Sequence, residues 1–189
     1  PTLDYVVTKV ARFPFDKFSD ASNKLGTQMK ATGEVMSIGR TMEESLLKAM
    51  RSLETGVCHI YHKKFEDWTN DRLLEYIAEP TDDRLYAIAQ LIRGGVDLVL
   101  IYNRTKIDMF FLEKFKNIVE FERVVEAAPM DIEVLREAKR MGFSDKFIGQ
   151  LWGVSQHDMY LLREKNGIFP VYKMIDTCAS EFSSYVPYF

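Results

Sequence analysis

Two hydrophobic patterns follow one another along this chain, a strand-like pattern first and a helical pattern afterwards. A β-branched run at residues 6–10 and a glycine-flanked run at 33–39 predict two strands, which a loop over 16–27 separates. Thr41, followed three residues later by Glu44, predicts a capping box at the start of a helix. The buried stripe of this helix is predicted at Leu46, Leu47, Met50 and Leu53. The opening block is therefore predicted to be a small α/β segment.

From about residue 66 onward, helical segments follow one another with short polar breaks. We expect helices over residues 68–78, 83–93, 96–103, 107–127, 131–141, 144–152 and 155–165. Pro80 cannot continue a helix, and Gly94-Gly95 and Gly142 suit left-handed C-terminal caps. The predicted N-caps are Asp131, Ser144 and Ser155. The longest helix is apolar over more than one stripe, so we expect it at the centre of a bundle or against a second chain. The predicted fold is mainly α.

Composition narrows the classes of partner. The chain has 189 residues, of which 47% are hydrophobic, enough for a globular core. Its 25 basic against 28 acidic residues, a net charge of −3, supply no general attraction for nucleic acid or an anionic membrane. The two cysteines, Cys58 and Cys178, form no disulfide framework and suit a reducing cytoplasm. We therefore expect protein partners, with no nucleic acid and no membrane.

The candidate metal and phosphate sites are weak. Cys58, His59 and His62 offer metal-ligating side chains, but a structural zinc site takes four well-spaced ligands, so we interpret this stretch as a polar linker. No glycine-rich segment has the spacing of a phosphate-binding loop. The residues therefore predict no catalytic, cofactor-binding or metal-binding site in this chain.

Residues 144–165 have the length and central glycine of a helix-turn-helix, with Gly153 at the turn. The exposed set of its second helix is predicted to be Gln156, His157, Asp158, Arg163, Glu164 and Lys165. This mixture of charges is poorly suited to a groove lined with phosphates, which favours a corner of the bundle. A stand-alone helical adaptor or helix-turn-helix DNA-binding module stays open as the alternative function.

Several segments carry a resemblance to a known family. Residues 33–54 read GEVMSIGRTMEESLLKAMRSLE, and residues 170–182 read PVYKMIDTCASEF. Residues 4–9 (DYVVTK), 105–112 (TKIDMFFL) and 139–145 (KRMGFSD) agree in the same order. Together they resemble the large subunit of carbamoyl-phosphate synthase over essentially the whole chain. Ala11 stands where that family commonly has proline and Phe110 where it commonly has tryptophan.

The resemblance implies four regions. Residues 1–54 correspond to the C-terminal part of the first ATP-grasp half, which forms carboxyphosphate, and residues 55–68 to a linker. Residues 69–169 correspond to an all-helical oligomerisation domain, and residues 170–189 to a junction strand leading to the second ATP-grasp half. Because the chain begins at Pro1 without an initiating methionine, we interpret it as part of a longer protein.

The resemblance also implies the function of the parent enzyme. That cytoplasmic ligase makes carbamoyl phosphate from bicarbonate, ammonia released from glutamine, and two ATP, for pyrimidine and arginine biosynthesis. It uses ATP, Mg²⁺ (or Mn²⁺) and K⁺, and works with a glutaminase small subunit and its other large-subunit domains. The groups that hold ATP and metal lie upstream of Pro1 in the family, so this chain is expected to be inactive alone and to act in homo-oligomer formation.

The resemblance and the helical pattern each predict one further site. Leu3 corresponds to a strand that borders the ammonia tunnel of the family, so we expect it to lie next to that tunnel. The predicted oligomer interface, on the first helix after the linker, comprises Trp68, Leu73, Leu74 and Ile77. The alternative, that these four side chains fill the domain's own core, stays open.

Overall fold

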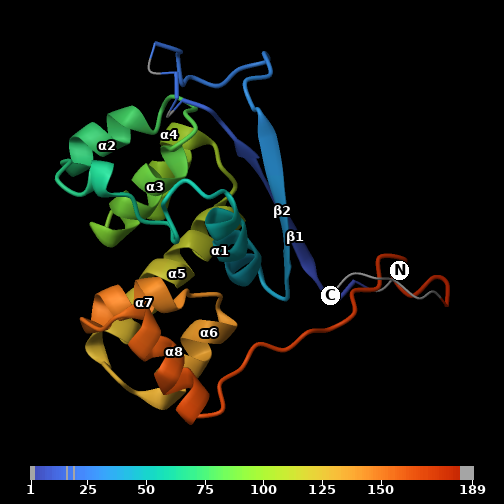
Figure 1. Ribbon diagram of the computed structural model, residues 1–189. Coiled ribbons are helices and arrows are strands. Elements are labelled where there is room, and N and C mark those ends of the chain that lie inside the picture. The colour runs from blue at the N-terminus through green and yellow to red at the C-terminus, as the bar shows by residue number, and fades with distance from the viewer. Residues whose placement is uncertain (1–2, 16, 19, 184–189) are drawn as a thin grey trace.

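The computed structural model describes residues 3–15, 17–18 and 20–183, and within them the chain is mainly α with a small two-stranded sheet at its N-terminal end (Figure 1). β1 (Val6–Arg12) and β2 (Gly33–Gly39) pair antiparallel, from Val6 opposite Gly39 to Arg12 opposite Gly33. Helix α1 (Met42–Ser52) packs against both strands. The predicted strands and the predicted mainly α fold are confirmed.

The capping box starts α1 as predicted, with one shift. The Thr41 hydroxyl accepts the backbone N–H of Glu44 at 3.2 Å, while the Glu44 carboxylate accepts the N–H of Arg40, the residue before the cap, at 2.8 Å. Ser45 then donates to the Thr8 hydroxyl at 2.7 Å and ties the helix to β1. These polar contacts orient α1 so that its apolar stripe faces the helical part of the chain.

The helical region contains all the predicted helices. They are α2 (Asn70–Tyr76), α3 (Arg84–Arg93), α4 (Leu98–Thr105), α5 (Met109–Ala127), α6 (Ile132–Arg140), α7 (Asp145–Trp152) and α8 (Gln156–Lys165), with a short 3₁₀ turn η1 (Lys63–Phe65) before α2. The caps at Asp131, Ser144 and Ser155 form as predicted. α4 and α5 begin two residues later than predicted, because Asp97 and Asp108 are the actual N-caps.

Helix α5 is central, as its broad apolar surface predicted. α1, α3, α4, α6 and α7 all pack against it. Its side chains at Leu112, Ile118 and Val125 are fully buried. Figure 1 shows α5 running between α1, α3 and α4 at one end and the α6–α8 group at the other. One helix therefore joins the two halves of the bundle.

The segment 55–68 is not the polar linker that we predicted from its sequence. His59, Ile60 and Phe65 are each at most 1% exposed, and Ile60 and Phe65 belong to the same hydrophobic core as Leu47 of α1. The correction has a physical cause: α1 and α3 pack on the same central helix, so the chain between them crosses the interior. The core is continuous across the predicted boundary between residues 54 and 69.

The predicted junction strand does not form in its described part. Residues 170–183 contain no helix or strand, and Figure 1 shows this segment running away from α8. A strand needs a neighbour to pair its backbone N–H and C=O groups, and no described segment lies in register with this one. Residues 184–189 lie outside the described part of the chain.

Candidate functional site

The predicted interface on α2 divides into a buried and a partly exposed pair. Leu73 and Ile77 are 1% and 0% exposed and fill the chain's own core, so they offer no surface to a second copy. Trp68 and Leu74 are partly exposed and pack against that core. The Arg72 guanidinium already covers the Trp68 ring at 3.6 Å. The core alternative therefore holds for Leu73 and Ile77, and an interface role for the other two stays a prediction.

Leu3 lies just before β1 with its side chain largely exposed. No described segment encloses it in a cavity. Its predicted position beside an ammonia tunnel is therefore still a prediction about a larger assembly.

Exposed apolar side chains gather on α4 and on the first turn of α5, two helices that pack against each other. We call this set the α4–α5 patch: Val99, Leu100, Tyr102, Phe110 and Phe111. Each is between 39% and 52% exposed. These residues were predicted to be helical, but the patch does not show in the sequence, because a helix that is apolar on several sides does not reveal which side the bundle covers.

A buried polar network joins α3, α5 and the segment 55–68. Glu122 of α5 accepts two hydrogen bonds from the Arg93 guanidinium of α3, Nε to Oε2 at 2.7 Å and Nη2 to Oε1 at 2.6 Å. The same Oε1 is 2.9 Å from Nε2 of His59. Arg93 also donates to the carbonyl of Ile60 at 3.0 Å. One carboxylate thus joins the segment 55–68 to two helices.

The network holds a neutral histidine beside an ionised carboxylate. Burial lowers the pKa of His59 below its ordinary value, and the hydrogen bond to Glu122 does not compensate. Burial alone would raise the pKa of Glu122, but the hydrogen bonds from Arg93 and His59 outweigh it and lower that pKa. The His59 ring stacks on Phe147 at 3.7 Å between centroids, and its Nδ1 has no hydrogen-bond partner among the described residues. A proton on Nε2 alone fits these contacts.

We expect the protein to lose stability as the pH falls below 6.5, the ordinary pKa of histidine. Below that value His59 becomes protonated in the unfolded chain but stays neutral in the folded chain. The free energy of unfolding therefore falls by up to about 1.4 kcal/mol per pH unit. The fall ends when the pH reaches the lowered pKa of His59 in the folded state. Urea unfolding between about pH 5 and pH 7 measures this slope. His59→Gln should flatten it, whereas His157→Gln, at an exposed position, should not. Equal slopes in both variants would contradict the assignment.

A second ionic cluster fixes the end of the bundle. Asp145 of α7 accepts from Lys139 of α6 at 2.8 Å and from Arg163 of α8 at 2.7 and 3.0 Å. Arg163 also donates to the carbonyl of Ile168 at 3.0 Å. This arginine, a predicted contact residue of the helix-turn-helix alternative, is therefore engaged inside the protein. The geometry favours the bundle-corner interpretation of α7 and α8.

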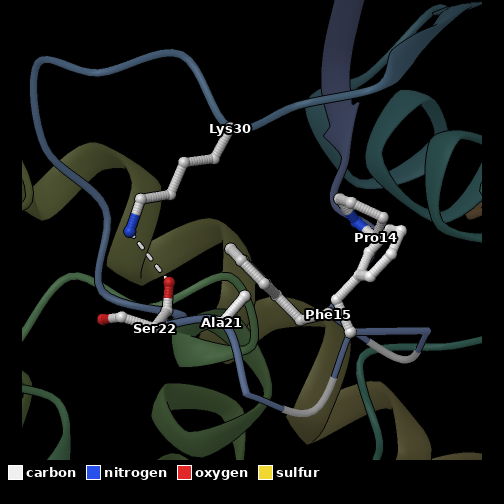
Figure 2. A pocket seen from close by; sticks show the side chains of 6 residues that line it. Pro14, Phe15, Ala21, Ser22 and Lys30 are labelled. Atoms are coloured by element: carbon white, nitrogen blue, oxygen red, sulfur yellow. Dashed lines mark hydrogen bonds between the residues drawn. The ribbon is translucent and has the colours of Figure 1, made fainter.

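Two surface hollows in the described part of the chain contain cationic side chains. A pocket of about 240 Å³ in the loop between the strands is lined by Pro14, Phe15, Phe18, Ala21, Ser22 and Lys30. Figure 2 shows the Lys30 ammonium turned toward the carbonyl of Ser22, to which it donates at 2.8 Å. A cleft of about 460 Å³ between β2 and α1 contains Lys48 and Arg51, which donate to the carbonyls of Ile38 and Gly142. These cations satisfy backbone groups of the fold itself.

Metal-ligating side chains do not converge. His59 faces Glu122, whereas Nδ1 of His62 accepts the N–H of Lys64 at 3.0 Å and caps η1. Within residues 3–15, 17–18 and 20–183, no group of three or more His, Cys, Asp or Glu is placed to hold a metal ion. No helix in the described part has the length and apolarity to span a membrane.

Comparison with protein families identifies the whole helical region. The family described as the oligomerisation domain of the carbamoyl-phosphate synthetase large chain matches residues 34–167. This match begins in β2, includes α1 and the buried segment 55–68, and ends just after α8, so it covers the continuous core described above. The chain therefore belongs to the family of carbamoyl-phosphate synthase large-chain oligomerisation domains.

Proposed function

We propose that this chain is the assembly region of the large chain of a glutamine-dependent carbamoyl-phosphate synthase and that it acts by self-association. The observation that carries the proposal is the match of the oligomerisation-domain family to residues 34–167, which contain every helix of the described chain. The interior ionic groups support it, because Glu122, Arg93 and Asp145 are engaged in structural contacts. A rigid bundle with exposed apolar helices is suited to association.

The proposal also includes the reaction of the complete enzyme. We infer that the complete enzyme makes carbamoyl phosphate from bicarbonate, glutamine-derived ammonia and two ATP in the cytoplasm, for pyrimidine and arginine biosynthesis. Its ATP, Mg²⁺ (or Mn²⁺) and K⁺ would bind in ATP-grasp domains, and a glutaminase small subunit would supply ammonia. Support comes from the resemblance of residues 4–9 and 170–182, which flank the matched region, to that subunit. We also propose that Leu3 lies beside the ammonia tunnel of the complete enzyme.

Sedimentation velocity over a range of concentrations tests the proposed self-association. The 22.0 kDa chain should sediment increasingly as an oligomer as its concentration is raised to about 100 μM, a range that detects even weak transient interfaces. It should show no ATP hydrolysis with bicarbonate present. A chain that stays monomeric throughout this range contradicts self-association, and bicarbonate-dependent ATP hydrolysis contradicts a purely structural role.

A further inference from the structure

We propose that the α4–α5 patch is where a second copy of this chain docks, with the two α4 helices antiparallel across a two-fold axis beside Leu100. The inference rests on the proposed self-association and adds the surface and the symmetry of the contact. It adds a surface to the predicted one, in which an interface role for Trp68 and Leu74 stays a prediction.

The bundle covers little of α4. Within this helix Ile101 alone is fully buried, while Val99 and Leu100 are about half exposed at 51% and 52%. A surface helix normally turns its large aliphatic side chains toward the core and polar ones outward. Large apolar side chains left exposed on a helix can mark an interaction site. By contrast, Leu73 of α2 and its C-cap residue Ile77 are buried in the chain's own core.

The α4–α5 patch is aromatic, and lysines lie at its border. The Phe110 and Phe111 rings meet edge to face at 5.4 Å, and two lysines lie over exposed rings, Lys106 over Tyr102 at 5.3 Å and Lys114 over Phe110 at 5.4 Å. Aromatic side chains are enriched at the centre of protein interfaces, and charged groups form the rim. The patch has this arrangement.

Helix α4 carries opposite charges at its two ends. Asp97 caps the start of α4, and Arg104 lies in its last turn; both are exposed, and Arg104 forms no ion pair with any residue in the described ranges. The midpoint between positions 97 and 104 lies next to Leu100, and both positions lie on the same side of α4 as Leu100. A two-fold axis there places Asp97 near Arg104 of the second copy, twice. It also sets the helix dipoles antiparallel, which is favourable.

The test compares two leucines on exposed helix surfaces. Leu100→Arg should weaken dimerisation at least about tenfold in sedimentation velocity, because it places two like charges beside the axis. Leu161→Arg on α8, where the leucine is similarly exposed at 45%, should leave the dimer constant unchanged. Far-ultraviolet circular dichroism confirms that each variant keeps its helices.

A cross-link keeps the inference testable if Leu100→Arg fails to fold. In a background of Cys58→Ser and Cys178→Ser, Leu100→Cys should form a disulfide-linked dimer on mild oxidation, because a residue at the axis meets its own copy. Leu161→Cys should not. If the unmodified chain dimerises but Leu100→Arg dimerises equally well, or if both cysteine variants cross-link alike, the assigned surface is wrong and self-association stands. If the unmodified chain never dimerises, the proposed function itself fails.

Discussion

Replacing Glu122 by alanine is expected to lower the free energy of unfolding by about 3–5 kcal/mol. The carboxylate balances the Arg93 guanidinium through two hydrogen bonds and also accepts one from His59. Its loss leaves the arginine charge with less than a fifth of its side-chain surface in water and no acidic partner. Urea unfolding at neutral pH, followed by circular dichroism, measures the change.

Glu120 provides the matched control on the same helix. Its side chain is 55% exposed and pairs with Lys116 one turn earlier, so Glu120→Ala should change stability by no more than about 0.5 kcal/mol. The double variant Glu122→Met with Arg93→Met should be more stable than Glu122→Ala, because it removes both buried charges together. If Glu122→Ala is no more costly than Glu120→Ala, the network does not stabilise the fold as described.

Replacing Leu47 by alanine is expected to cost about 2–5 kcal/mol. Leu47 is fully buried in α1, and it belongs to the same core as the helices after residue 69. Since the core is continuous, the variant should unfold in one transition at lower urea, with tryptophan fluorescence from Trp68 and Trp152 coinciding with circular dichroism. The lower free energy of unfolding would then apply to the whole bundle.

Leu161→Ala removes the same atoms from an exposed helix position and should change stability by no more than about 0.5 kcal/mol. Two separated transitions in the Leu47→Ala variant, with the helical signal intact in the second, would contradict a shared core. That outcome would instead support the domain boundary predicted near residue 54.

The local part of this fold could be predicted from the sequence because its causes are local. The caps at Thr41, Asp131, Ser144 and Ser155 satisfy backbone N–H groups within three residues, so their positions show in the sequence. Errors of two residues at α4 and α5 arose where Asp97 and Asp108 were taken as helix interior. The family resemblance, which the match over residues 34–167 confirms, likewise depends on the order of residues alone.

The arrangement in space needed the tertiary structure. His59 and Glu122 are separated by 63 positions, and Glu122 and Arg93 by 29, so no local pattern links them. Without that link, His59 resembled a residue of a polar linker. The same limit applied to Leu73 and Leu100, which are both helical leucines.

Sequence alone determined the helices, the caps at Thr41, Asp131, Ser144 and Ser155, the mainly α class and the family of this protein. Only the packed structure decided that Leu73 is buried while Leu100 faces solvent, and that segment 55–68 crosses the core. The physical reason is that hydrogen bonds within a helix turn depend on near neighbours, whereas burial depends on which distant helices occupy the space around a side chain.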